Sequence, residues 1–273
     1  MAVTMADITH LRKMTGAGMM DCKNALNEAG GDFDKAMEII RKKGQAVAAK
    51  REDRDASEGC VLAAGKDGFA AIVALKCETD FVAKNADFID LTKKILDLTM
   101  EKQPASIEEL VALPLDGTPI NDRITERIGV TGEKMELGFY EYVKAPVTIS
   151  YIHPGNKLAT IVGFNQPAEL QVMKDVAMQV AAMNPISLTK EAIPANVIEK
   201  EFTIAKEKAR EEGKPENMVD KIAEGRMIKF YKEVCLLQQE FIKDAKITVE
   251  QYLKNNDKNL GITEFKRVTL NVD

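Results

Sequence analysis

The sequence predicts an α+β protein with three parts. These are an N-terminal three-helix domain, a duplicated α+β core with three-stranded antiparallel sheets, and a helical hairpin inserted into the second half of the core. Apolar residues first recur at the spacing typical of helices. Two β-hairpin patterns follow, and the order strand, strand, helix, strand occurs twice, which suggests an internal duplication. A chain of 273 residues is also long enough for two or three compact units.

Residues 1–54 are predicted to form three short helices and a linker. Apolar residues are spaced three positions apart in the first helix and recur at i, i+3, i+4 and i+7 in the other two, so each helix has one apolar face. The three apolar faces consist of Met5, Ile8 and Leu11, then of Cys22, Ala25, Leu26 and Ala29, and then of Phe33, Ala36, Met37 and Ile40. Cys22 is therefore expected in the core of this small domain.

Local signals predict where these helices begin and end. Gly30-Gly31 is typical of a left-handed cap after the second helix, and Asp32 is a good N-cap for the third. Lys42-Lys43-Gly44 is predicted to end the third helix, because cations favour the negative end of the helix dipole. The small and charged residues that follow predict a helical or flexible linker.

Residues 55–144 are predicted to form the first half of the core. Runs of β-branched and small apolar residues on either side of a glycine-containing turn predict a hairpin, and helical spacing resumes after it. The predicted elements are strands at 60–64 and 69–75, helices at 88–98 and 121–128, and a third strand at 135–143.

Residues 145–273 repeat this order. A second hairpin turns at His153-Pro154-Gly155-Asn156, and a helix, a short helix and a closing strand follow it. The predicted elements are strands at 147–151 and 158–164, a helix at 170–183, a short helix around 249–253 and a strand at 265–272.

An insertion at about 193–241 lies within this second half. Apolar residues at 198, 202, 205 and 209 alternate between steps of four and three, and Gly213-Lys214-Pro215 then breaks the helix. A second apolar face follows at 218, 222, 225 and 228. We expect an antiparallel hairpin with arms about 25 Å long, which is either a stabilising flap or a lever that grips a partner.

Composition limits the possible functions. The chain has 38 Lys plus Arg, 43 Asp plus Glu and a net charge of −5, which argues against direct binding of nucleic acid. No apolar run is long enough to span a membrane and no signal peptide is apparent, so a cytoplasmic location is expected. Only two histidines and four scattered cysteines occur, so we expect a binding protein with no cofactor and no metal site, rather than an enzyme.

Several residues are candidates for a binding surface. Met19 and Met20 are either core filler or an adaptable exposed contact. Thr79 or Asp80 can cap a helix, but Asp80 and Phe81 can also project together at a strand end as a charge and an apolar anchor. His153 is expected to be exposed at a hairpin tip, as turn decoration or as a partner contact. A phosphate-binding loop is absent, so any nucleotide is expected on a partner.

Residues 11–23 and Thr79-Asp80-Phe81-Val82-Ala83-Lys84 closely resemble the two signature segments of the bacterial elongation factor Ts family. The resemblance extends over nearly the whole chain, including residues 224–230. It implies an N-terminal domain similar to ubiquitin-associated domains, a two-part core and a coiled-coil arm. It also implies that the chain is a guanine-nucleotide exchange factor for the GTPase elongation factor Tu.

The resemblance assigns roles to the candidate residues. Asp80 and Phe81 would be the intruding pair, in a turn shaped by Thr79 and Val82. Phe81 would enter a pocket between helices of the GTPase and shift the elements that hold its magnesium ion, while Asp80 disturbs the same region. Other partner contacts implied by the resemblance are Arg12, Met19, Met20, His153, Phe241 and Ile242.

Some members of the family continue into a C-terminal helix beyond the closing strand. This sequence ends almost directly after that strand, so we expect a weaker or differently distributed interface. Two alternatives remain. One is a stabilising partner of the same GTPase that does not promote exchange, and the other is a cytosolic enzyme that uses Cys22 or Cys77 and would need a thiol of depressed pKa.

Overall fold

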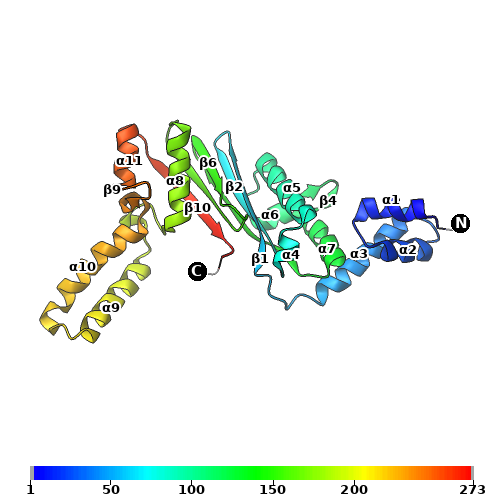
Figure 1. Ribbon diagram of the computed structural model, residues 1–273, viewed down its shortest axis with the longest axis horizontal. Coiled ribbons are helices and arrows are strands. Elements are labelled where there is room, and N and C mark those ends of the chain that lie inside the picture. Colours follow the sequence, from blue (N-terminus) through cyan, green and yellow to red (C-terminus); the bar gives the residue numbers. More distant parts are fainter. Residues whose placement is uncertain (1–2, 272–273) are drawn as a thin grey trace.

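The computed structural model describes residues 3–271 and confirms the predicted α+β class. The core has four layers (Figure 1). Two three-stranded antiparallel sheets pack face to face in the middle, and helices cover the outer face of each sheet. A three-helix unit and a helical arm lie at the two ends of this elongated body (Figure 1).

The first sheet consists of β1 (Glu58–Lys66), β2 (Phe69–Cys77) and β5 (Met135–Lys144), with β2 in the centre. Asp67 and Gly68 form the hairpin turn, and both have positive φ angles, of 50° and 79°. Such a turn matches the twist of the strands it joins, and glycine adopts this conformation without strain.

The second sheet has the same topology. It consists of β6 (Val147–Ile152), β7 (Leu158–Phe164) and β10 (Ile262–Thr269), with β7 in the centre. In both sheets a hairpin is completed by a later strand that pairs antiparallel with its second strand. The closing strand was predicted at 265–272, but it begins three residues earlier and ends at Thr269. Residue 272 lies outside the described residues.

Strict alternation along β2 builds the two sides of the core. Phe69, Ala71, Val73 and Leu75 face the helices, whereas Ala70, Ile72 and Ala74 face the second sheet. Both sets are buried, so the strand reads as a continuous apolar run. Ile161 of β7 and Val268 of β10 complete the layer between the sheets.

Helices cover the outer faces of both sheets. Those on the first sheet are α5 (Ala86–Lys102), α6 (Ile107–Ala112) and α7 (Ile120–Thr131), and those on the second are α8 (Leu170–Met183) and α11 (Val249–Asn256). The bounds predicted for α8 match the structure. Small elements that the sequence did not indicate are the hairpins β3 (Pro114–Leu115) with β4 (Thr118–Pro119) and β8 (Glu240–Phe241) with β9 (Asp244–Thr248), and the single turns η1 (Lys190–Ala192) and η2 (Leu236–Gln238).

The N-terminal unit consists of α1 (Met5–Thr15), α2 (Met19–Glu28) and α3 (Phe33–Ala49). Cys22 is fully buried in its core, and Asp32 caps α3 by accepting a hydrogen bond from the backbone N–H of Lys35. Residues 42–44 were predicted to end α3, and this prediction is wrong. The helix continues for five more residues because Gly44 is buried where α3 crosses α7.

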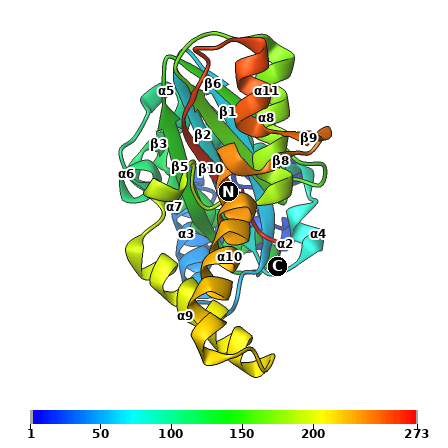
Figure 2. The same cartoon turned by 90° about the vertical axis from the view of Figure 1, so that its left-hand side faces the viewer.

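The predicted insertion is an antiparallel hairpin of α9 (Ala195–Glu211) and α10 (Glu216–Val234), and it extends away from the sheets as an arm (Figures 1 and 2). The residues buried between its two helices are Ala205, Ala209, Val219, Ala223 and Met227. The apolar face predicted for the second helix at 218, 222, 225 and 228 is wrong, because Met218 and Ile228 are exposed and the buried face of α10 lies one position away. Domain boundaries at 54/55 and at 144/145 stay predictions.

Candidate partner-binding site

The candidate turn lies at the end of the central strand β2. Thr79 is the N-cap of a one-turn helix, α4 (Asp80–Ala83), and its hydroxyl accepts a hydrogen bond from the backbone N–H of Val82 at 3.4 Å. The capping interpretation is therefore correct for Thr79. Capping does not exclude a contact role, because the first turn of α4 presents Asp80 and Phe81 at the surface.

Phe81 is the most exposed large apolar side chain in the described part of the chain, with 83% of its surface accessible. Leaving a phenylalanine in water forgoes about 2 kcal/mol of burial free energy, so such exposure is unfavourable for the folded protein alone. A partner that buries the ring would recover this free energy.

Asp80 carries a negative charge beside this ring. Its Oδ2 lies 2.6 Å from Nζ of Lys84, one turn further along the chain. This bond holds the pKa of Asp80 below its ordinary value, and the positive charge of Lys157 acts in the same direction. Asp80 is therefore ionised at neutral pH.

The second hairpin lies beside this turn. Lys157 pairs with Glu58 of β1 at 2.7 Å, and the carbonyl of Asn156 accepts a hydrogen bond from the N–H of Val61 at 2.7 Å. His153, in the same hairpin loop, is exposed, and its Nδ1 lies 3.0 Å from the hydroxyl of Tyr151. The structure thus brings the predicted contacts around residue 80 and the loop of His153 to the same end of the sheets.

The predicted N-terminal contacts lie on a separate surface. Arg12, Met19 and Met20 are all exposed, so the interpretation of the two methionines as core filler is wrong. Gly18 is the N-cap of α2, and both methionines therefore lie in its first turn, outside the apolar face formed by Cys22, Ala25 and Leu26. This unit lies at the end of the molecule opposite the arm (Figure 1).

Phe241 and Ile242 differ in accessibility. The ring of Phe241 is buried and stacks on Tyr252, with ring centroids 4.0 Å apart. It supports the fold and offers no surface to a partner. Ile242 is 41% exposed, and its backbone N–H donates a hydrogen bond to Gln179 at 2.8 Å. Only Ile242 of this pair lies at the surface.

The four cysteines are free and buried. Burial raises the pKa of the Cys60 thiol to about 11, and burial together with the charge of Glu133 raises that of Cys77 to about 12. A nucleophilic cysteine needs a depressed pKa and access to a substrate. Cys77 meets neither condition, and Cys22 is fully buried.

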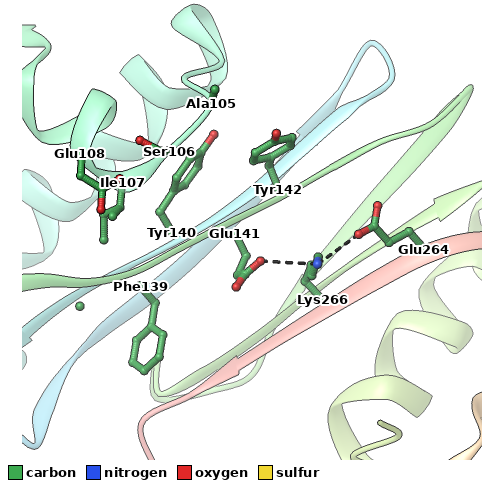
Figure 3. A pocket seen from close by; sticks show the side chains of 11 residues that line it. Ala105, Ser106, Ile107, Glu108, Phe139, Tyr140, Glu141, Tyr142, Glu264 and Lys266 are labelled. Atoms are coloured by element: carbon green, nitrogen blue, oxygen red, sulfur yellow. Dashed lines mark ion pairs between the residues drawn. The ribbon is translucent and has the colours of Figure 1, made fainter. Parts of the chain in front are cut away.

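A hollow of about 620 Å³ lies between the exposed edges of β5 and β10 (Figure 3). Tyr140 and Tyr142 line one side, and Lys266 pairs with Glu264 at 3.1 Å and with Glu141 at 3.7 Å. None of the predicted site residues lines it. Because Lys266 is paired with two carboxylates, its positive charge is already neutralised within the hollow.

Two further observations concern residues 3–271. No group of three or more His, Cys, Asp or Glu side chains in this range is placed to hold a metal ion. None of its helices combines the length and the apolar character that crossing a membrane requires.

Sequence reasoning missed Glu133, which bonds to the turn, and Lys157, whose charge acts on Asp80. Glu133 precedes β5 and bonds to Thr79, and Lys157 belongs to the second hairpin. No local signal identifies either residue, because each comes near the turn only through the pairing and packing of strands.

The family described as Elongation factor TS matches residues 78–271. The chain is 65% identical to elongation factor Ts of Porphyromonas gingivalis and 60% identical to that of Azobacteroides pseudotrichonymphae, over the full length of both chains in each case. It is 46% identical to elongation factor Ts of Bacteroides fragilis over 330 aligned positions, again with both chains covered completely. The chain belongs to the elongation factor Ts family of translation elongation factors.

Proposed function

We propose that this chain is a guanine-nucleotide exchange factor that binds elongation factor Tu and promotes the release of GDP. The observation that carries the proposal is the exposed ring of Phe81 beside the half-buried carboxylate of Asp80 on a short capped turn. Membership of the elongation factor Ts family supports the choice of partner. The protein acts in the cytoplasm, where translation takes place.

The proposed mechanism is displacement rather than catalysis. In a GTPase, Mg²⁺ bridges phosphate oxygens to the protein, so a shift of its ligands weakens nucleotide binding. Phe81 inserts as an apolar wedge between helices of the partner, and the ionised carboxylate of Asp80 disturbs the region that holds Mg²⁺. No covalent bond is made or broken, so the factor is not an enzyme.

This coupling is reciprocal. If the factor lowers the affinity of the partner for nucleotide, nucleotide lowers the affinity for the factor by the same ratio. Excess GTP then dissociates the complex and frees the factor for another round. The other proposed contacts, Arg12, Met19, Met20, His153 and Ile242, hold the two proteins together while the wedge acts.

The first test is the release of a fluorescent GDP analogue from elongation factor Tu under excess unlabelled nucleotide. We expect a large, concentration-dependent acceleration by the wild-type protein. Phe81→Ala should lower the accelerated rate at least about tenfold, which corresponds to about 1.4 kcal/mol of lost transition-state stabilisation. The matched control is Phe139→Ala, because Phe139 is also an exposed phenylalanine but lies beside the hollow of Figure 3.

Normal exchange by Phe81→Ala would show that the wedge mechanism is wrong. Binding of the wild-type protein to elongation factor Tu without any acceleration would instead favour the alternative, a partner that stabilises the GTPase without exchange. The exposed ring of Phe81 and the ionised Asp80 beside it argue against this alternative, because a purely stabilising partner does not need them.

A further inference from the structure

Beyond the last backbone pair of β2 and β5, the two chain segments stay connected by hydrogen bonds to side chains. The last paired residues are Cys77 and Met135. The backbone N–H of Lys134 then donates to Oε1 of Glu78 at 2.7 Å, and the backbone N–H of Thr79 donates to Oε2 of Glu133 at 3.1 Å. Each strand end is thus bonded by a carboxylate from the other, in a reciprocal arrangement.

Glu133 makes the stronger of these connections to the candidate turn. Its Oε1 also accepts a hydrogen bond from the Thr79 hydroxyl at 2.6 Å, so one carboxylate holds both the backbone and the side chain of Thr79. Bonds to an ionised acceptor are stronger than neutral ones, and two bonds fix orientation as well as distance. The same Thr79 hydroxyl accepts the N–H of Val82, which links Glu133 to α4.

Glu133 is itself held in place. Gly132 ends α7 in the left-handed conformation, with φ of 74°, and the N–H of Glu133 donates to the hydroxyl of Thr131 at 3.2 Å. Glu133 therefore lies in the short connection between a packed helix, α7, and a paired strand, β5. Such elements are more rigid than loops, which suits a group that positions another.

The turn needs support of this kind. A helix of four residues has no stability of its own, because its nucleation is unfavourable. Of its residues Ala83 is buried and Val82 is partly buried, and both pack against the core of the first sheet. The apolar contacts of Val82 and Ala83 hold the C-terminal side of α4. The polar contacts of Thr79 hold its N-terminal side, from which Asp80 and Phe81 project.

We propose that Glu133 is a positioning residue for exchange, and that its carboxylate holds Thr79 and thereby aims Phe81 at the partner. This inference rests on the exchange function proposed above. Glu78 plays a different part, because it also lies 3.7 Å from Arg51 and 3.8 Å from Arg54 and so connects the strand end to the segment after α3.

The test measures the release of fluorescent GDP from elongation factor Tu as a function of factor concentration. Glu133→Ala should lower the maximal rate about threefold to tenfold, because the turn loses its two bonds. The half-saturating concentration should stay within about threefold of the wild-type value, since the contacts outside the turn remain. Glu264→Ala, in an exposed pair with Lys266 on β10, is the matched control and should exchange normally.

Two further variants separate positioning from general damage to the fold. Glu133→Gln should restore most of the lost rate, because an amide oxygen can accept the Thr79 N–H and an amide N–H can donate to its hydroxyl. Thr79→Val removes the hydroxyl from the other side of the same contact and should lower the maximal rate as well.

A double-mutant cycle with Phe81→Ala gives the sharpest result. If Glu133 acts only through the wedge, adding Glu133→Ala to Phe81→Ala should change the rate less than about twofold. An equal loss in both backgrounds, or a wild-type rate for Glu133→Ala, would overturn the positioning role. A wild-type protein that binds without accelerating release would overturn the proposed function, and the positioning role with it.

Discussion

Asp175 shows how one buried side chain can organise the second half of the core. Only 4% of its surface is exposed, and its carboxylate accepts hydrogen bonds from Lys243 at 2.7 Å, Tyr252 at 3.0 Å and Gln171 at 2.6 Å. Burial alone would raise the pKa of Asp175. The three donors outweigh burial, and its pKa lies below the ordinary value of 3.8.

This shift predicts a pH dependence. A carboxyl group whose pKa is lower in the folded state contributes its full stability above the unfolded pKa and loses it as the pH falls through the folded pKa. Asp175→Asn should therefore lower the free energy of unfolding by about 2 kcal/mol at pH 7 and by less at pH 3, because the contribution of the carboxylate declines as the pH falls below 3.8. Urea unfolding at both pH values measures the difference. Asp244→Asn is the control, because Asp244 follows Lys243 in the chain but is exposed. It should change the free energy of unfolding little at either pH.

Local sequence patterns do not predict whether a single aromatic side chain is exposed or buried. Phe81 and Phe241 are both aromatic residues in segments that resemble family contact regions, yet one is exposed and the other is buried against Tyr252. Nothing in the local sequence distinguishes them. The difference depends on whether another element covers the ring.

At the scale of elements, the crossing of α3 with α7 attaches the N-terminal unit to the core. A Cβ added at Gly129 of α7 would lie 2.7 Å from Cα of Gly44, so the two backbones touch. Arg41 and Asp122 form an ion pair beside the crossing. Two glycines on facing helices permit this approach, whereas a larger residue at either position would force the helices apart.

Gly129→Ala should therefore destabilise the protein by about 1 to 3 kcal/mol, although alanine favours helices more than glycine does. Gly225→Ala provides the contrast. Gly225 lies in α10 with nothing within 4 Å of an added Cβ, so alanine there should stabilise the arm by about 0.5 to 1 kcal/mol. Denaturant unfolding of both variants measures whether the free energy of unfolding falls for Gly129→Ala and rises for Gly225→Ala. A stabilising Gly129→Ala would mean that the helices separate without cost.

At the scale of the whole molecule, the arm is an appendage to a body that is complete without it. Within residues 3–271, the buried apolar clusters of the sheets and their helices include no residue of α9 or α10. The two helices of the arm bury their apolar residues mainly against each other. The arm and the N-terminal unit lie at opposite ends, with α4 between them (Figure 1).

Replacement of residues 198–231 by a short glycine-serine linker should therefore leave the body folded. Cooperative thermal unfolding of the shortened protein checks this expectation. If the arm is a lever that grips the partner, the half-saturating concentration in the exchange assay should rise at least about tenfold, while the maximal rate stays close to that of the full chain. An unchanged half-saturating concentration would indicate that the arm is a stabilising flap. Loss of the maximal rate with unchanged binding would mean that the arm acts on the nucleotide site directly.

The sequence by itself determined the fold class, the order of the main strands and helices, and the duplicated topology. The individual strands and helices follow from interactions within a few residues, and the repeated order of strand, strand, helix and strand indicates the duplication. The continuous apolar run of β2, the apolar face of α2, the cap at Asp32 and the break at Gly213 are all local signals. The signature around Thr79 to Val82 also identified the candidate turn before its geometry was known.

Tertiary structure alone decided the rest. The sequence did not predict that α3 continues past Gly44 or that Phe241 is buried while Met19 and Met20 are exposed. It also did not predict that Glu133 bonds to Thr79, 54 positions away in the chain. The physical reason is the same in each case. Burial and long-range hydrogen bonds depend on which elements pack together, and the local pattern of a segment does not contain that information.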